Sequence, residues 1–120
     1  MRVVYIAGAY RDSGENGVWE NIMRARTVAR QLWYMGLIAI CPHTNSIMMG
    51  GNDLPPEVFL EGGLEILRRC DAIFMLRNWK ESIGAQKEWE LAKELDIPVI
   101  YEEDANNIVE LLNLKWGVRA

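Results

Sequence analysis

Short apolar runs alternate with longer stretches in which apolar residues recur at helical spacing. Each short run is rich in large apolar or β-branched residues and is bounded by turn-forming or charged residues, which predicts a buried strand. The longer stretches place apolar residues three or four positions apart, which predicts amphipathic helices. The predicted strands cover residues 3–7, 37–41, 71–76 and 97–101, and the predicted helices cover 18–35, 57–70, 83–95 and 107–114.

This alternation of strands and helices predicts an α/β fold around a parallel sheet. Right-handed crossovers between the strands give a doubly wound, flavodoxin- or Rossmann-like sheet with the expected strand order 2-1-3-4. In such a sheet, ligands bind at the carboxyl ends of the strands where the order reverses, here between the first and third strands. The length of 120 residues suits one domain, so we expect residues 1–120 to form a single unit.

Composition narrows the class of partner. The chain has a net charge of −4, which argues against binding a nucleic acid polymer, although a small anionic ligand needs only a local positive pocket. Cys41 and Cys70 lie far apart and belong to no Cys/His cluster, so we expect no metal site and a reduced, cytoplasmic setting. The first apolar run is too short for a signal peptide or a membrane span, so we expect no membrane partner.

One carboxylate interrupts the apolar side of the third predicted helix. Ser82 is a favourable N-cap, and winding the residues after it at 3.6 per turn gathers small and apolar side chains on one side, with Glu88 at the centre. A carboxylate in a partly dry pocket can act as a nucleophile or as an acid/base, and burial raises its pKa. The alternatives are an error in the helical phase and a structural pair with a buried arginine.

Two loops meet at the predicted crevice, residues 8–17 after the first strand and 77–84 after the third. Ser82 and the first free N–H groups of its helix point into the crevice and suit an anion such as phosphate. Gly84 removes a side chain where a ligand approaches. Arg11, in the other loop, supplies positive charge, with a solvated surface arginine as the alternative.

Aromatic side chains around the crevice have structural as well as ligand-binding interpretations. Tyr5 on the first strand either hydrogen-bonds to Glu88 and orients it or fills the core. Trp79 either stacks on a base or seals the loop or an interface. His43, the single histidine, is either a pocket residue or a structural one after the second strand.

Several short motifs together resemble the nucleoside 2-deoxyribosyltransferase superfamily. They lie between residue 3 and about residue 101, and the SxGxxxE element from Ser82 to Glu88 is the most specific of them. The chain looks most similar to a small uncharacterised-domain branch of that superfamily and to the 2′-deoxynucleoside 5′-monophosphate N-glycosidases. The motifs are VYIAGAYR, NxxxA at 21–25, CPH at 41–43, CDAIFML, NWxxSxGAxxE at 78–88, and IPV.

The resemblance implies chemistry at an N-glycosidic bond of a small-molecule nucleotide. By this resemblance, Glu88 is the nucleophile that attacks C1′ of the sugar, and Tyr5 is the tyrosine that contacts it. Ser82 matches the serine that binds phosphate in the monophosphate glycosidases, where the classical transferases tend to carry an aspartate, so a 5′-monophosphate is favoured. A carboxylate beside an oxocarbenium-like sugar needs neither metal nor redox cofactor, so we expect no cofactor.

Further residues are expected in the site around Glu88, Tyr5 and Ser82. By the same resemblance, Arg11 matches a loop position used for phosphate, and His43 matches a histidine near the pocket. The complete expected substrate-binding set is Gly8, Ala9, Tyr10, Arg11, His43, Asn78, Trp79, Ser82 and Gly84.

The sequence departs from the glycosidases at one position. Their helix before the third strand carries an aspartate that contacts the sugar hydroxyl, and its counterpart here falls near Gly63. Glu61 or Glu65 can substitute for it only by facing the pocket. The alternative function is therefore a non-catalytic module that binds a nucleotide on the same surface.

Two further expectations concern a rival class and the assembly. A receiver-like phosphotransfer domain is a weaker alternative, because residues 8–10 provide no acidic cluster after the first strand. The resemblance implies a homo-oligomer, a dimer or higher, and the helix around residues 58–67 agrees because it is apolar on more than one face.

Overall fold

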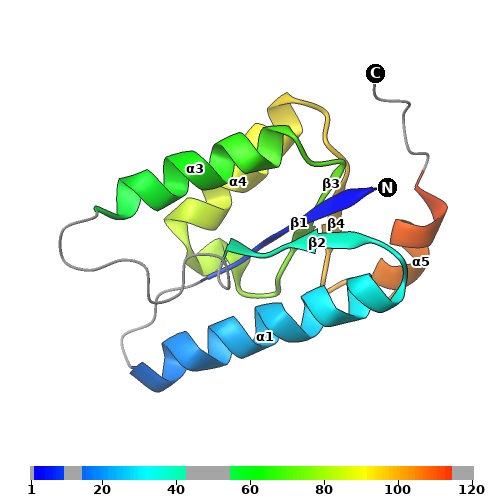
Figure 1. Cartoon of the computed structure of the whole chain (residues 1–120), viewed down its shortest axis with the longest axis horizontal. Coiled ribbons are helices and arrows are strands. Elements are labelled where there is room, and N and C mark those ends of the chain that lie inside the picture. Colours follow the sequence, from blue (N-terminus) through cyan, green and yellow to red (C-terminus); the bar gives the residue numbers. More distant parts are fainter. Residues whose placement is uncertain (1, 10–14, 43–54, 115–120) are drawn as a thin grey trace.

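Four parallel strands form the centre of the molecule (Figure 1). The computed structural model describes residues 2–9, 15–42 and 55–114. The strand order is β2-β1-β3-β4, so the predicted order 2-1-3-4 is confirmed. In the register, Tyr5 of β1 lies opposite Ile40 of β2 and Ile73 of β3. The strands are β1 (Val3–Ala7), β2 (Ile38–Ile40), β3 (Ala72–Met75) and β4 (Val99–Tyr101).

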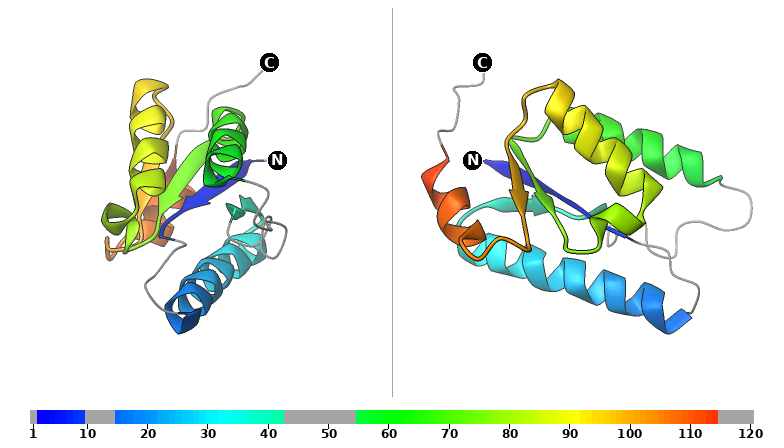
Figure 2. Two further views of the ribbon diagram at one scale, coloured as in Figure 1. Left: turned by 90° about the vertical axis from the view of Figure 1, so that its left-hand side faces the viewer. Right: turned by 180° about the vertical axis from the view of Figure 1, so that it is seen from behind.

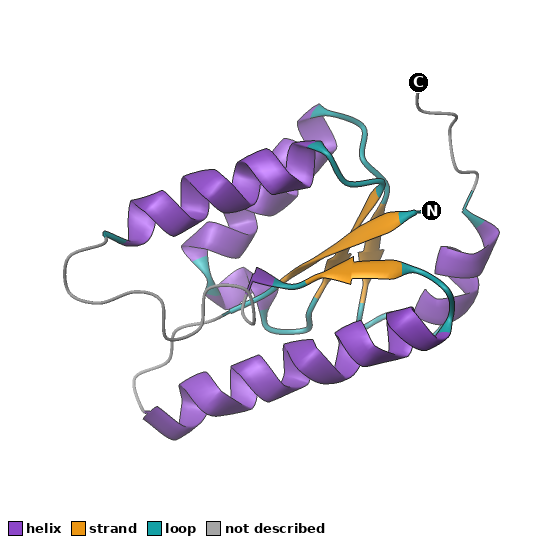
Figure 3. Cartoon of the chain, viewed as in Figure 1, coloured by secondary structure: helices purple, strands orange, loops and turns teal. Residues whose placement is uncertain are grey.

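Helices cover both faces of the sheet. Figure 2 shows α1 on one side of the strands and the α3–α4 pair on the other, and Figure 3 shows the strands enclosed between these layers. A short 3-10 helix, η1, joins the end of β3 to α4. The described helices are α1 (Glu15–Tyr34), α3 (Pro56–Arg68), η1 (Trp79–Glu81), α4 (Ile83–Glu94) and α5 (Asn107–Asn113). None of the helices in the described ranges combines the length and the apolar character that crossing a bilayer requires.

Element boundaries differ from the predicted ones by a few residues. The helix predicted to begin at residue 57 begins at Pro56, which is compatible because the first helical position needs no backbone N–H donor. The strand predicted from Ile97 begins only at Val99. Asp96 adopts a φ of 56°, and the Ile97 N–H still donates to the carbonyl of Ala92 at 2.9 Å, so the turn after α4 extends further than the apolar pattern indicates.

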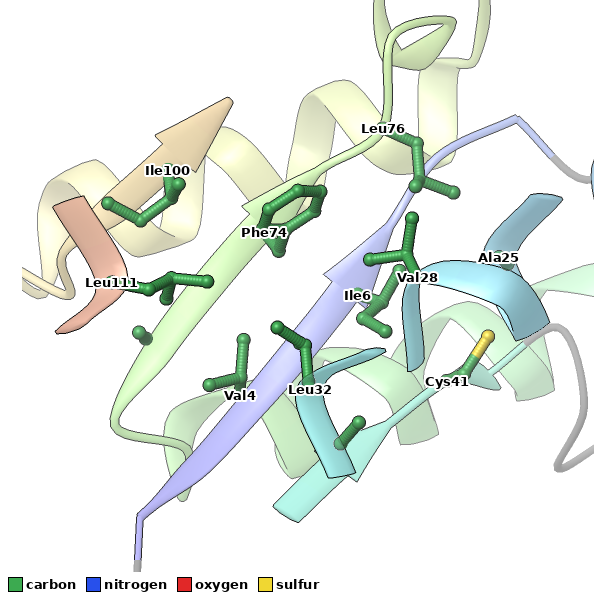
Figure 4. Close-up of a cluster of buried hydrophobic side chains, with 12 residues drawn as sticks. Val4, Ile6, Ala25, Val28, Leu32, Cys41, Phe74, Leu76, Ile100 and Leu111 are labelled. Carbon is green, nitrogen blue, oxygen red and sulfur yellow. The ribbon is translucent and has the colours of Figure 1, made fainter. Parts of the chain in front are cut away.

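Two hydrophobic clusters hold the layers together, one on each face of the sheet. Figure 4 shows the first cluster, in which Val4 and Ile6 of β1 pack with Val28 and Leu32 of α1 and with Leu111 of α5. The second cluster lies under α3 and α4 and includes Tyr5, Ala7, Leu67, Ile73, Met75, Trp79, Ala85, Leu91 and Ala92. Successive residues of β1 therefore alternate between the two faces, and Tyr5 belongs to the α3–α4 side.

The outer side of α3 retains exposed apolar residues, Val58 and Ile66. This agrees with the expectation that the helix is apolar on more than one face. The homo-oligomer expected from that pattern stays a prediction.

Gly8 lets the chain leave β1 against the end of β3. A Cβ at Gly8 would lie 2.7 Å from Cδ1 and 2.8 Å from Cβ of Leu76, and 3.1 Å from Oδ1 of Asn78. Real Cβ atoms essentially never come as close to another heavy atom as the two distances to Leu76 would require. Glycine at this position is therefore required by the packing of the two segments that lead to the predicted crevice.

We expect Gly8→Ala to lower the free energy of unfolding by about 1–3 kcal/mol, because the new methyl group overpacks the contact with buried Leu76. Urea denaturation followed by circular dichroism measures the change. Gly84→Ala is the control, since its Cβ would meet Leu60 and Ser82 at ordinary distances of 3.6 and 3.7 Å. Equal midpoints for wild type and Gly8→Ala would contradict the steric argument.

Candidate functional site

Three elements converge on one carboxylate. Tyr5 comes from β1, Glu88 from α4, and Gly63 from α3. A Cβ placed on Gly63 would lie 2.7 Å from the Tyr5 hydroxyl oxygen and 4.0 Å from Oε2 of Glu88. The hydroxyl, the carboxylate and the backbone of α3 thus form one cluster between the sheet and the α3–α4 pair.

Glu88 is buried at this junction. Its relative exposure is 9%, and it is the single buried carboxylate among the described residues. Burial raises the pKa of Glu88 to about 7 from its ordinary value of 4.5, and a hydrogen bond from Tyr5 opposes part of that rise. Across the described ranges, Oε2 finds no partner in hydrogen-bonding geometry. The predicted inward carboxylate is present, and it carries unused acceptor capacity.

Tyr5 keeps its proton beside this carboxylate. Burial raises the pKa of the Tyr5 hydroxyl well above its ordinary value, and the charge of Glu88 raises it further. Smaller contributions in the same direction come from Cys70 and Cys41. The hydroxyl is therefore a hydrogen-bond donor at any physiological pH, and donation toward Glu88 favours the ionised carboxylate.

Ser82 caps the helix that carries Glu88. Its Oγ accepts a hydrogen bond from the N–H of Ala85 at 3.1 Å, so the predicted N-cap is confirmed. The first N–H groups of an α-helix have no partner within the helix, and the helix dipole favours an anion there. Gly84 lies in this first turn, and a side chain there would make only ordinary contacts within the chain. Packing against the described residues does not explain why position 84 lacks a side chain.

Asn78 connects three segments around the crevice. Its Oδ1 accepts from the N–H of Ala9 at 3.1 Å, and its Nδ2 donates to Oδ1 of Asn21 at 2.9 Å. The amide therefore ties the end of β1 and helix α1 to the segment after β3. Asn21 was not among the predicted site residues, although it opens the NxxxA motif.

Trp79 lies in an aromatic cluster that supports α4. The residue is 8% exposed, and its ring stacks on Trp89 with 5.3 Å between ring centroids. The indole N–H of Trp89 donates to the hydroxyl of Tyr101 at 2.9 Å. This placement favours the sealing role that was the alternative to base stacking.

A family profile covers most of the chain. It matches residues 2–101 and is described as a domain of unknown function, DUF4406. The chain belongs to the DUF4406 family. Nothing among curated proteins matches the chain.

Solved structures share the fold of this DUF4406 domain at low sequence identity. A 2-deoxyribosyltransferase from Bacillus psychrosaccharolyticus is 19% identical with a TM-score of 0.59, over 89% of this chain and 79% of that protein. A 2-desoxiribosyltransferase from Leishmania mexicana is 17% identical with a TM-score of 0.59, over 84% of this chain and 63% of that protein. A conserved protein from Enterococcus faecalis V583 is 16% identical with a TM-score of 0.61, over 96% and 77%. The expected fold resemblance to 2-deoxyribosyltransferases is confirmed.

The predicted site residues of the DUF4406 domain fall into three groups. Tyr5 and Glu88 lie together, and Ser82 and Gly84 lie in the first turn of the same helix as Glu88. Gly8, Ala9, Asn78 and Trp79 make the packing and hydrogen-bonding contacts given above, and direct contact of these residues with a ligand stays a prediction. Tyr10, Arg11 and His43 lie outside the described residues.

The two acidic residues considered as substitutes near position 63 do not face Glu88. Glu61 is exposed. Glu65 is exposed as well and lies 3.9 Å from Arg69 in an ion pair along α3. The residue of α3 that does face the carboxylate is Gly63, so the described part of α3 brings no acidic side chain to Glu88.

An open hollow also lies between α1 and β2. Arg26, Arg30, Trp33 and Tyr34 line it together with residues of the strand. It contains none of the predicted site residues, and α1 packs on the opposite face of the sheet from Glu88. The chemistry of Glu88 is therefore separate from this hollow.

We expect Glu88→Gln to stabilise the protein in a pH-dependent way. The folded-state pKa of about 7 exceeds the ordinary 4.5, so the stability of the wild type falls as the pH rises from about 4.5 to 7. Removing the ionisable group should therefore raise the free energy of unfolding by up to about 3 kcal/mol at pH 8 and by little at pH 4.5.

Urea denaturation at both pH values measures this difference. Glu90→Gln, an exposed neighbour on the same helix, is the matched control and should show no such pH dependence. A gain that is the same at both pH values, or absent, would show that Glu88 is not held out of water.

Proposed function

We propose that this protein breaks or exchanges the N-glycosidic bond of a nucleoside 5′-monophosphate, with Glu88 as the nucleophile. The observation that carries the proposal is the buried Glu88 carboxylate, whose Oε2 lacks a partner among the described residues while Tyr5 orients the group. A buried acceptor without a partner is costly, and a ligand atom is a suitable partner. Two solved structures of the same fold are 2-deoxyribosyltransferases, which supports chemistry at a sugar–base bond.

The proposed first step exchanges one bond to carbon for another. A carboxylate oxygen of Glu88 forms a bond to C1′, and the C1′–N bond breaks with its electron pair going to the base nitrogen. The departing base takes a proton from water. Oxocarbenium character at C1′ is stabilised by the negative carboxylate at close range.

The second step restores Glu88. The oxygen of a water molecule forms a bond to C1′, the ester bond to Glu88 breaks, and the proton released by this water replaces the one consumed in the first step. The net reaction adds water and gives a free base and a sugar phosphate. If a second base attacks instead of water, the product is a new nucleotide, and the reaction is a transfer.

The position of Ser82 supports a phosphate-bearing substrate. Ser82 and the free N–H groups of the first turn of α4 lie on the helix that carries Glu88, one and a half turns before it. A helix N-terminus attracts anions through its N–H groups and its dipole. Gly84 adds no side chain to this turn.

The second candidate function is nucleotide binding without catalysis. The observation in its favour is Gly63, which brings no acidic side chain to the carboxylate. A binding module would show a thermal shift with nucleotides and would never release a base.

We expect the purified protein to release free base from at least one member of a panel of ribo- and deoxynucleoside 5′-monophosphates. Glu88→Gln should lower the rate by at least about 1,000-fold, because it removes the nucleophile while keeping the shape of the side chain. Liquid chromatography of the bases measures the rate, with and without an acceptor base.

Glu90→Gln is the matched control and should retain the wild-type rate. If the wild type releases no base under any condition but is stabilised by nucleotides, the binding module is correct and the catalytic proposal is wrong.

We expect Ser82→Asp to separate capping from phosphate binding. Aspartate is as good an N-cap as serine, so the fold should keep its stability, whereas Ser82→Ala should lose about 1 kcal/mol. The added negative charge repels phosphate, so affinity for a monophosphate should fall by about tenfold or more.

Calorimetric titration of a nucleoside and its 5′-monophosphate measures the two affinities. The affinity for the nucleoside should be nearly unchanged in Ser82→Asp. Equal losses for both ligands would mean that Ser82 does not contact the phosphate.

A further inference from the structure

The α3 backbone approaches the Tyr5 hydroxyl more closely than any side chain at the same position would allow. A Cβ at Gly63 would lie 2.7 Å from the hydroxyl oxygen but 3.9 Å from the ring carbon Cζ. The steric conflict therefore involves the oxygen alone. Among the described residues, no other atom outside the helix's own backbone lies nearer to this point than 3.9 Å, so the hydroxyl is the group that requires glycine here.

The neighbouring glycine shows that this requirement is specific. Gly62 is exposed, and a Cβ there would meet no atom of the described part of the chain within 4 Å. Both glycines lie inside α3, where glycine weakens a helix relative to alanine. The same helix therefore carries two glycines with the same intrinsic cost, and contacts with the described residues give a packing reason for Gly63 but not for Gly62.

We propose that Gly63 is a positioning residue, because its bare backbone is the surface against which the Tyr5 hydroxyl rests while it faces Glu88. The inference deepens the proposed function and rests on it for the part that concerns catalysis. The backbone of Tyr5 is held in β1 by its pairing with β3, and its hydroxyl lies against the backbone of α3 at Gly63. The hydroxyl is thereby kept next to the carboxylate of Glu88. Gly63 acts on the reaction through Tyr5 and does not itself touch the reacting atoms.

Burial sets the main shift in the pKa of Glu88, and Tyr5 is the described side chain that opposes it. From β1, Tyr5 lowers the pKa of Glu88 by donating to it. From α3, Gly63 brings no charge, and Glu61 and Glu65 are exposed. Cys70 and Cys41 act on Tyr5 and not directly on Glu88. Displacing the hydroxyl should therefore raise the pKa of Glu88 further.

A double-mutant cycle tests the contact without any assay of activity. Gly62→Ala should raise Tm by about 3 °C, because it improves helix propensity at an open position. Gly63→Ala should lower Tm by about 5 °C, because its methyl group meets the Tyr5 hydroxyl. In a Tyr5→Phe background the oxygen is gone, and Gly63→Ala should then raise Tm as Gly62→Ala does.

Two results would overturn the proposal. One is a Gly63→Ala effect that is the same in the wild-type and Tyr5→Phe backgrounds, which would show that the hydroxyl is not the obstacle. The other is a gain in Tm from Gly63→Ala in the wild type, which would show that there is no close contact.

A second measurement tests positioning directly. The ionisation of Glu88 can be followed by NMR of ¹³C-labelled carboxyl groups, with Glu88→Gln identifying the signal. Gly63→Ala and Tyr5→Phe should both move this titration to higher pH, and Gly62→Ala should leave it in place. An unchanged titration in Gly63→Ala, with an altered one in Tyr5→Phe, would mean that the tyrosine keeps its place without the glycine.

The activity assay completes the test and keeps the two proposals separate. If base is released, Gly63→Ala should lower kcat about tenfold or more with little change in KM, and shift the pH profile to higher pH, whereas Gly62→Ala should change none of these. If the wild type releases no base, the proposed catalysis fails while the thermal cycle and the titration still decide the role of Gly63.

Discussion

A carboxyl group held out of water against a tyrosine hydroxyl is the constraint on which the rest of this structure depends. Glu88 lies where β1, α3 and α4 meet, and its burial opposes folding at neutral pH because the charged form loses hydration. The hydrophobic clusters on the two faces of the sheet must offset that cost. Sites that bind or transform ligands commonly contain a buried group that lowers the stability of the fold.

The features predictable from the sequence were those fixed by local periodicity. Short apolar runs alternating with helices were enough to specify the parallel strand order, because crossover handedness leaves few alternatives. The inward position of Glu88 followed from counting residues after a well-defined cap, and the hydrogen bond from Ala85 to Ser82 shows that the cap sets this phase. Such signals need no knowledge of what lies across the sheet.

What the sequence could not supply were contacts between segments far apart in the chain. Asn78 bonds to Asn21, 57 residues away, and no local pattern indicates which partner an amide will find. Gly63 lies against Tyr5 only because α3 is rotated about its axis in one particular way. That rotation is decided by the packing of the whole helix on the sheet. The late start of β4 had a different reason: the turn after α4, with Asp96 at a φ of 56°, runs into the apolar segment, and the apolar pattern does not show where that turn ends.

The stacked pair of Trp79 and Trp89 gives the protein an intrinsic spectroscopic signal. Two stacked indoles with centroids 5.3 Å apart, that of Trp79 buried and that of Trp89 partly buried, couple their electronic transitions, which gives a circular dichroism signal in the ultraviolet that isolated indoles lack. One indole lies on η1 and the other follows Glu88 directly on α4. Their coupling therefore tracks whether the segment after β3 remains docked on that helix, without any added label.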